Sequence, residues 1–381
     1  MKKLLVIDSA VSSSNPSMKS WLRAFSDIVE LFDEIEIWSM ECEVADHPKV
    51  RWVRFKQLKH YRLGIKLFAF QVTQMFKTRE QEFLKDAIVQ VTGLLNFKTD
   101  INYLHFSYKI FRGIYMQKRE AFNMSFVRRA LMWQSDKRET KILNSTGKLA
   151  RFWVVSRELG QDLVAQANDD VELSVVPNSY DDIRFSLVTK ERYRAEYRRN
   201  YGFSESDKVL VFASLSHFER KGLFSGIDAV LKACEQGAPY KFLILGGTKK
   251  DIAKAKKSIK LHNYQDNIIF AGLVSDIEKH LSCADGLLFP SHFEAFSLSE
   301  IEAAAIGLRL YLTKHYGTEM IMREPRNGRF IPWDVEGMAN CLVEDWKQDA
   351  WSKQQWDVGE ALNPKKFSDH ICLLYRKLID E

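Results

Sequence analysis

The chain of 381 residues contains only five cysteines, and none of them forms a C-x-x-C pair. Neither a disulfide framework nor a zinc site is therefore indicated, and a reducing compartment is expected. No apolar run is long enough to cross a bilayer. The apolar start MKKLLVIDSA is interrupted by Asp8 too early for a signal peptide and favours a first strand instead. We therefore expect a cytoplasmic protein.

Other features are also absent. The sequence has no solenoid-length repeat and no low-complexity tract. It shows no cluster of residues with metal-ligand spacing, so no metal or other cofactor is expected. No recognised nucleic-acid-binding module accompanies the formal charge of +6, so nucleic acid is not an expected partner. The length and the ordinary globular composition predict two domains.

Strand-like and helix-like segments alternate along the chain, which predicts parallel sheets with right-handed crossovers. The strands predicted in the first half are Leu4–Asp8, Ile35–Ser39, Val50–Phe55, Ile101–Phe106, Arg151–Ser156 and Leu173–Pro177. The main helices predicted there are Ser17–Phe32, Glu80–Asn96 and Ser125–Gly147. The strands predicted in the second half are Val209–Leu215, Lys241–Leu245, Asn267–Ala271, Gly286–Pro290 and Arg309–Thr313. The turn-forming sequence VVPNSYDD places the domain boundary at 180/181.

Two glutamates, Glu294 and Glu302, follow the predicted buried strand of DGLLFPS in the segment SHFEAFSLSEIEAAAIG. Open α/β sheets bind ligands in such loops at the carboxyl ends of parallel strands. The amides of Phe296, Ser297 and Leu298 would be unpaired donors at the helix start, suited to phosphate, and Glu302 could accept from sugar hydroxyls. Two acids on a surface helix are the alternative, but the apolar residues around them disfavour it.

A second cluster, Arg220–Lys221–Gly222, lies in FASLSHFERKGLFSGIDAV between a predicted strand and helix. Positive charge at that place would face a diphosphate bound at the helix amino end. Taken alone, the two bases would favour a solvated turn before a helix. Their position, one strand–helix unit into the second domain, makes binding of a diphosphate the better interpretation.

The segment E-A-F-S-L-S-E-I-E resembles the donor-sugar signature E-G-F-G-x-x-x-x-E of the retaining glycosyltransferases of family 4. S-x-F-x-R-K-G resembles the phosphate-binding element of the bacterial lipopolysaccharide-core glucosyltransferases among them. PNSYD, LILGG, IFAGLVSD, YGTE and NGRFIP resemble further family turns in the same order.

The resemblance implies the GT-B fold, with two Rossmann-like domains facing a cleft. Residues 1–180 would bind the acceptor, residues 181–363 the nucleotide-sugar, and the helix 364–381 would cross back to the first domain. The implied activity is metal-independent, retaining transfer of a hexose from an NDP-sugar to a glycan or glycolipid, in cell-envelope polysaccharide or lipopolysaccharide synthesis. Glu294, Lys221 and Arg220 would be catalytic. The donor would be bound by Glu302, Phe296, Ser297, Leu298 and Gly222.

The first domain departs from the family. Its first loop, DSAVSSSNPSMKSW, is rich in serine and lacks glycine. Ser12 and Ser13 are candidates for binding the acceptor or a phosphate, and an ordinary strand–helix loop is the alternative. DINYLHF resembles the family's fourth-strand pattern, which places His105 at the carboxyl edge of the sheet. Because the family's V-x-x-H-G motif is missing after it, we expect His105 to be a structural or acceptor-lining residue and not a catalytic one.

Residues 48–79 contain nine Lys and Arg side chains and no acid, with aromatic residues between them. A second basic stretch contains Lys109, Arg112, Lys118, Arg119, Arg128 and Arg129. Basic residues beside exposed aromatics favour an anionic membrane surface, such as the inner face of the cell membrane. The alternative is that the aromatics are core residues and the bases a solvated rim.

Two other functions fit the same architecture. A sugar-nucleotide 2-epimerase would act without an acceptor, although the glutamate pair disfavours it. A non-catalytic protein that binds a glycan or an enzyme is the other alternative, because the first domain matches the family poorly.

Overall fold

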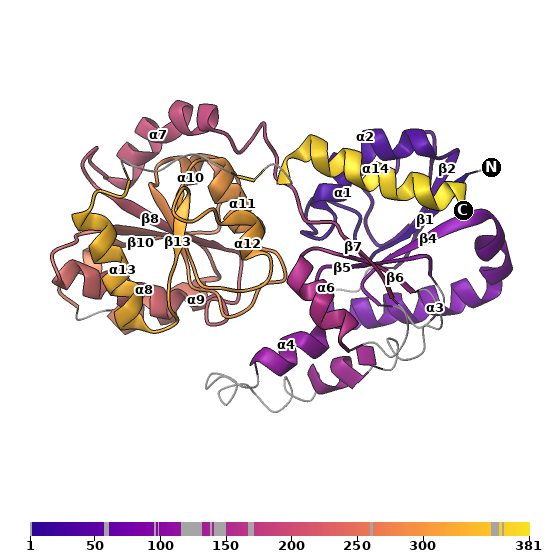
Figure 1. The fold of residues 1–381 in the computed structure, drawn as a ribbon, viewed down its shortest axis with the longest axis horizontal. Coiled ribbons are helices and arrows are strands. Elements are labelled where there is room, and N and C mark those ends of the chain that lie inside the picture. The colour runs from indigo at the N-terminus through magenta and orange to yellow at the C-terminus, as the bar shows by residue number, and fades with distance from the viewer. Residues whose placement is uncertain are drawn as a thin grey trace. The chain divides into compact units, whose positions relative to one another are not determined.

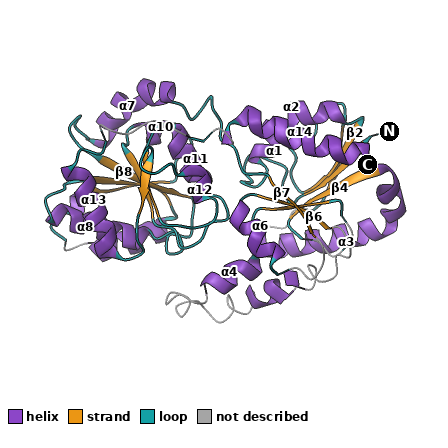
Figure 2. Cartoon of the chain, viewed as in Figure 1, coloured by secondary structure: helices purple, strands orange, loops and turns teal. Residues whose placement is uncertain are grey.

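The computed structural model describes residues 2–56, 61–94, 97, 99–115, 132–137, 139–140, 150–166, 171–259, 262–351, 358–359 and 362–381. The chain divides into two compact units, Met1–Asn178 with Pro364–Glu381, and Ser179–Asn363. Each unit contains one parallel sheet with helices packed around it (Figure 1). Figure 2 shows the strands of each unit at its centre, as expected for Rossmann-like units.

The sheet of the first unit has seven parallel strands in the order β3-β2-β1-β4-β5-β6-β7. Its strands are β1 Lys3–Ile7, β2 Glu34–Ser39, β3 Val50–Arg54, β4 Ala87–Thr92, β5 Ile101–Leu104, β6 Ala150–Val154 and β7 Val171–Val175. The six strands predicted in this half are confirmed within about two residues at most ends. β1 is buried along its whole length because it lies between β2 and β4.

The predicted helix Glu80–Asn96 is confirmed only over Glu80–Asp86. The helix α3 spans Tyr61–Asp86, and β4 follows it directly as Ala87–Thr92. The sequence AIVQVT of β4 is rich in β-branched residues, and pairing with β1 and β5 gives them a buried place in the sheet. The tertiary pairing therefore outweighs the helical pattern of the residues before it.

The predicted helix Ser17–Phe32 is broken into shorter pieces. Ala24 leaves helical geometry with φ −85° and ψ 0°, so that one helix ends and the next begins there. The pieces are α1 Lys19–Arg23, α2 Phe25–Ile28 and the 3-10 turn Val29–Leu31. The other helices of this unit are α4 Tyr108–Tyr115, α6 Arg157–Val164 and α14 Pro364–Asp380. Most of the predicted helix Ser125–Gly147 lies outside the described residues.

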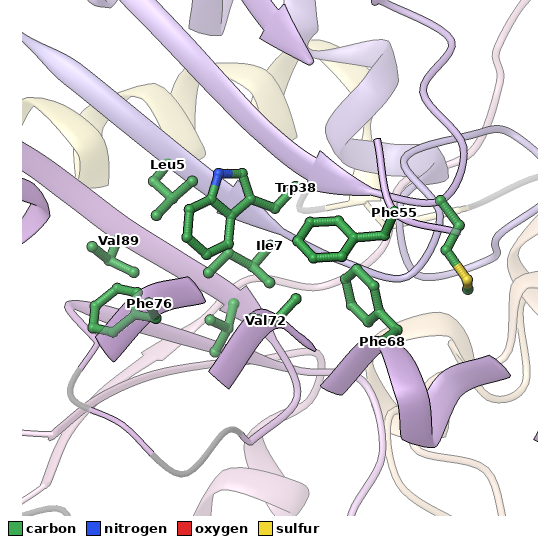
Figure 3. Packing of buried hydrophobic residues seen from close by; sticks show 10 residues of the cluster. Leu5, Ile7, Trp38, Phe55, Phe68, Val72, Phe76 and Val89 are labelled. Atoms are coloured by element: carbon green, nitrogen blue, oxygen red, sulfur yellow. The ribbon is translucent and has the colours of Figure 1, made fainter. Parts of the chain in front are cut away.

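One hydrophobic core of the first unit forms between the sheet and α3 (Figure 3). Trp38 of β2 packs against Phe55 and Phe76 at ring-centroid distances of 6.1 and 6.5 Å, and Phe55 packs against Phe68. These three phenylalanines belong to the basic stretch of residues 48–79. They are core residues, in agreement with the alternative in which the aromatics are buried and the bases form a solvated rim. Phe70 differs, because 61% of it is exposed. Lys118, Arg119, Arg128 and Arg129 lie outside the described residues.

The C-terminal helix α14 packs on the first unit, which confirms its predicted return. Tyr375 accepts a hydrogen bond of 3.0 Å from Trp21 Nε1 and donates one of 2.5 Å to Gln90. All three side chains are buried. Residues far apart in the sequence thus fix α14 beside α1 and the sheet.

The sheet of the second unit has six parallel strands in the order β10-β9-β8-β11-β12-β13. They are β8 Val209–Ser214, β9 Lys241–Gly246, β10 Ile268–Gly272, β11 Gly286–Phe289, β12 Arg309–Leu312 and β13 Gly328–Phe330. The helices are α7 Leu187–Tyr201, α8 Leu223–Glu235, α9 Lys249–Ile259, α10 Ile277–Ser282, α11 Leu298–Ala305, α12 Thr318–Ile321 and α13 Val335–Lys347. All five predicted strands are confirmed, and β13 was missed because its three residues were interpreted as a turn.

Candidate functional site

The strand order of the second sheet contains a switch point between β8 and β11. From β8 the chain continues outward through β9 and β10, and from β11 it continues the other way through β12 and β13. β8 and β11 pair directly, with Gly286 opposite Leu210. The loops that leave the carboxyl ends of these two strands are where an open α/β sheet binds its ligand. Arg220–Gly222 follows β8, and Ser291–Ser297 follows β11.

Glu294 lies at the centre of a charged cluster in these two loops. Its Oε1 lies 3.0 Å from Nζ of Lys221 and 3.2 Å from a guanidinium nitrogen of Arg220. Ser291 donates a hydrogen bond of 3.1 Å to the same oxygen. All three charged side chains are less than one-fifth exposed. The structure therefore brings together the three residues predicted to be catalytic.

The charge of Glu294 is fixed by these neighbours. Burial alone would raise the pKa of its carboxyl group, but Lys221, Arg220 and His315 lower that pKa to about 2. Glu294 is consequently an ionised acceptor at any physiological pH, and a hydroxyl group of a ligand could donate to it. Ser291 was not singled out from the sequence, although it is the last residue of the strand pattern DGLLFPS.

Gly222 allows the Lys221 loop to lie against the end of β11. It adopts φ +72°, and a Cβ atom built on it would lie 2.0 Å from the carbonyl oxygen of Pro290. On the same loop, the carbonyl oxygen of Arg220 accepts from the amide of His292 at 2.9 Å, and its guanidinium donates to the carbonyl of Phe293. Only glycine fits this close approach of two backbones. Gly222 is also the N-cap residue of α8.

The amino end of α11 provides the predicted backbone donors. Ser297 is its N-cap residue, and the helix begins at Leu298. Within the described residues no group accepts a hydrogen bond from the amides of Phe296, Ser297 or Leu298. The ring of Phe296 is buried and would meet a Cβ on Gly317 at 2.7 Å, so the loop is held by packing. Such amides, with the positive end of the helix dipole, favour an anion.

Glu302 lies on α11, partly exposed, while Glu300 two residues earlier is fully buried. The two side chains therefore point to different sides of the helix. Burial lowers the pKa of Arg184, but Glu278, Asp181 and Glu302 together raise it above its ordinary value. Arg184 is thus a neighbour of Glu302 that the sequence analysis missed.

A buried ion pair stands behind the cluster. Nε2 of His315 lies 2.9 Å from Oε1 of Glu300, with side-chain exposures of 3% and 0%. Burial lowers the pKa of His315, but the charges of Glu300 and Glu294 outweigh burial and raise it. Neither residue was predicted, because Glu300 stands inside the motif as a variable position and His315 stands in a turn sequence.

The serines predicted on the acceptor side lie beside carboxylates in the first unit. Ser13 donates through its amide at 2.8 Å and its hydroxyl at 2.5 Å to Glu43, and Ser12 donates at 3.3 Å to Glu41. Asp8, at the end of β1, is also buried, and burial raises its pKa to about 6. Negative charge around this loop favours a hydroxylated ligand over a phosphate.

His105 follows β5 in the first unit. Its ring lies 4.2 Å from that of Tyr103, and its Nε2 is buried with no hydrogen-bond partner within the described residues. Burial lowers the pKa of His105 to about 3, so the imidazole is neutral. A neutral ring suits a hydrogen bond to a hydroxyl group better than binding of an anion.

The described residues contain no group of three or more His, Cys, Asp or Glu side chains placed to hold a metal ion. Of the helices the structure describes, none has the length and apolarity needed to span a bilayer.

Residues 206–347 match the family model described as Glycosyl transferases group 1. This part of the second unit is therefore a glycosyl transferases group 1 domain, which contains both charged loops.

Two curated relatives match parts of the chain. An uncharacterized glycosyltransferase of Methanocaldococcus jannaschii is 23% identical over 243 residues, covering 59% of this chain and 62% of that protein. The mannosylfructose-phosphate synthase of Agrobacterium fabrum is 27% identical over 187 residues, covering 46% and 40% respectively. The chain thus matches less than two thirds of the length of each relative.

Three solved structures resemble the whole chain. WaaG, a glycosyltransferase involved in lipopolysaccharide biosynthesis, has a TM-score of 0.70 at 16% identity, over 97% of this chain and 99% of that one. The sucrose-phosphate synthase of Thermosynechococcus elongatus has 0.74 at 16%, over 100% of both chains. HepE of Anabaena, in complex with UDP-glucose, has 0.67 at 13%, over 98% and 99%. With the two parallel sheets, these similarities confirm the GT-B fold.

Proposed function

We propose that the protein is a glycosyltransferase that transfers a hexose, with retention of configuration, from an NDP-sugar to a glycan or glycolipid acceptor. The observation that carries the proposal is the contact of Glu294 with Lys221 and Arg220 at the switch point of the second sheet. The group 1 domain and the names of its relatives support a sugar transfer.

Departure of a nucleoside diphosphate builds up negative charge on its outer phosphate. Arg220 and Lys221 each have donors left over after contacting Glu294, since a guanidinium carries five N–H groups and an ammonium three. Together with the amides of Phe296, Ser297 and Leu298, they would stabilise that charge from two sides. Preorganised donors of this kind are usually the largest contribution to such catalysis. Positive charge from side chains supports a reaction without a divalent metal.

The two glutamates would then bind the sugars of the donor. Glu294, ionised and surrounded by cations, would accept from a hydroxyl of the transferred hexose and offset positive charge at its anomeric carbon. Glu302, on the partly exposed side of α11, would accept from the ribose hydroxyls. Gly222 contributes indirectly, because it allows the loop of Lys221 to approach β11.

The first unit would bind the acceptor. Its candidate groups are Ser12, Ser13 and the neutral His105, and the carboxylates beside the serines favour hydroxyl groups over phosphate at this point. The relation to WaaG supports an acceptor of the cell envelope. Exposed Phe70, with Lys66 and Lys77 on the same helix, supports a location at the inner face of the cell membrane. Sedimentation with vesicles containing phosphatidylglycerol tests that location, with Phe70→Ser as the variant expected to bind less.

A thermal-shift screen with UDP, GDP, ADP and CDP tests the donor site. A ligand that binds only the folded state raises the unfolding temperature, so one nucleotide should stand out. HepE binds UDP-glucose, which makes UDP the first candidate. The corresponding sugar nucleotide is then incubated with and without acceptor glycans, in EDTA. Transfer supports the proposal, whereas isomerisation of the sugar without an acceptor would identify a 2-epimerase. No response to any nucleotide would contradict the proposal.

A further inference from the structure

The buried pair His315–Glu300 connects two elements that shape the proposed donor site. His315 lies in the loop after β12, and Glu300 lies in the first turn of α11. Their charged atoms are 2.9 Å apart and almost completely removed from water. A buried ion pair contributes little net stability compared with apolar residues, but loss of one partner leaves a costly unpaired charge. Such a pair is therefore well suited to fixing a local arrangement.

The turn that contains His315 packs directly on the Glu294 loop. Tyr316 contacts Phe293 edge-to-face at 5.6 Å between ring centroids. Gly317, with φ +78°, faces Phe296 so closely that a Cβ there would lie 2.7 Å from the ring. The hydroxyl of Thr318 donates to the carbonyl oxygen of His315 at 2.7 Å and closes the turn. Movement of His315 would consequently be transmitted to both sides of Glu294.

The surroundings of the imidazole favour its doubly protonated form. Nδ1 lies 3.2 Å from the carbonyl oxygen of Tyr316, which can only accept. Nε2 lies 2.9 Å from Oε1 of Glu300, which is an ion-pair distance, but within the described residues no aligned hydrogen bond joins the two atoms. Glu294 is close enough to contribute to the electrostatics of the ring as well. Both ring nitrogens thus face oxygen acceptors, which is the arrangement of an imidazolium.

We propose that His315 is a positioning residue of the donor site, which as an imidazolium holds Glu300 of α11 and the loop of Glu294 in place. The inference rests on the proposed function, since His315 would hold residues of the same donor site in place. His315 is then a third cation near Glu294, in addition to Arg220 and Lys221. The turn after β12 holds it in place. The other charged pair of the turn, Lys314 and Glu319, is exposed and lies 3.7 Å apart.

The arrangement predicts a defined dependence on pH. The pKa of His315 is raised in the folded protein. The support that the imidazolium gives to the donor site is therefore complete at pH values below the pKa of an unfolded histidine. The support is lost as the pH rises through the folded value. Glu294 keeps its charge over that range, because its carboxyl group is already ionised.

NMR of the full chain labelled with 15N-histidine tests the coupling without any ligand. The resonance missing from His315→Gln identifies the ring. We expect its midpoint to lie above that of an exposed histidine, and to fall by at least ~0.5 pH unit in Glu294→Gln and in Glu300→Gln. Glu319→Gln is the control, because it removes an exposed carboxylate from the same part of the chain and should leave the midpoint unchanged. A midpoint at or below ~6.5, or one insensitive to Glu294→Gln, would overturn the inference.

Nucleotide binding provides the second readout. Affinity for UDP, or for the nucleotide selected by the thermal-shift screen, is measured by calorimetry from pH 6 to 9. The wild-type protein should lose affinity at least ~3-fold across the midpoint of His315, and His315→Gln should be weak and independent of pH. The double variant Glu300→Gln/His315→Gln avoids an orphaned buried charge and should behave like the single variant. A normal pH profile in it would overturn the positioning role. If no nucleotide binds at all, the proposed function fails, while the NMR titration still decides on the coupling.

Discussion

Nζ of Lys221 lies 3.0 Å from Oε1 of Glu294, although the two residues follow different strands. Because β8 and β11 are neighbours, their loops meet at the switch point of the sheet. In the proposed function, the carboxylate accepts a hydrogen bond from a sugar hydroxyl, and the cations beside it stabilise the departing diphosphate.

Replacement of Lys221 by alanine should lower kcat by about 10²-fold or more, because one preorganised cation for the leaving group is lost. Arg220 would keep Glu294 paired, so the fold should survive. Turnover with the sugar nucleotide selected by the screen is the measurement. The control is Lys232→Ala, whose side chain pairs with exposed Glu336 on another helix and should leave the rate unchanged. A near-normal rate for Lys221→Ala would remove the phosphate role.

Glu302→Ala should weaken binding of the nucleoside diphosphate by about 10-fold, the loss expected for a charged acceptor to a ribose hydroxyl. The predicted loss is specific to ribose, so the affinity for inorganic pyrophosphate should stay the same. Calorimetry with both ligands gives the comparison. Glu336→Ala, which removes an exposed glutamate of α13, is the matched control. Unchanged nucleotide affinity in Glu302→Ala would contradict the ribose assignment.

Gly222→Ala should destabilise the protein much more than Gly202→Ala. Both glycines have positive φ, +72° and +73°, so each alanine carries the cost of left-handed geometry, roughly 1–2 kcal/mol. At Gly202 a Cβ meets nothing within 4 Å, whereas at Gly222 it meets the carbonyl oxygen of Pro290 at 2.0 Å. Overpacking should add about 1–3 kcal/mol there. Urea denaturation compares the free energies of unfolding of the two variants. Equal losses of stability would show that the close approach of Gly222 to Pro290 does not add to the cost of alanine.

Asp8→Asn should stabilise the protein at alkaline pH. Burial raises the pKa of Asp8 to about 6, so the folded state binds its proton more tightly than the unfolded state. Stability therefore falls as the pH rises through the interval from the unfolded value, near ~3.9, to about 6, and stays low above it. Asparagine cannot ionise, and it retains an oxygen for the donors Ala10 and Asn15. We expect a gain on the order of 1–3 kcal/mol at pH 8 that shrinks towards pH 4. A gain in stability that does not depend on pH would contradict the raised pKa of Asp8.

The sequence was most informative where motif and fold depend on the same residues. The placement of Glu294, Lys221 and Gly222 in loops after neighbouring strands could be predicted, because a buried strand, a tight turn and a helix start leave clear local patterns. The strand β4 could not, because AIVQVT follows a long helical pattern without a turn-forming residue between them. Its β-branched residues gain a buried place only by pairing with β1 and β5, and this pairing is not visible in the local sequence.

His315 and Glu300 were missed for a related reason. Each is an ordinary polar residue in its own segment, and their significance arises only when β12 places the turn against α11. The aromatic residues of the basic stretch show the converse, since the charge around them suggested a surface while Phe68 and Phe76 pack into the core. Local composition does not indicate which side of a helix faces the sheet.

The preference for diphosphate over monophosphate tests the central claim most directly. Calorimetry measures binding of the selected nucleoside diphosphate and its monophosphate to the wild-type protein and to Lys221→Met. Because Lys221 is proposed to contact the outer phosphate, the account predicts a strong preference for the diphosphate in the wild type that largely disappears in the variant. A preference of the same size in both proteins would show that the pyrophosphate binds elsewhere.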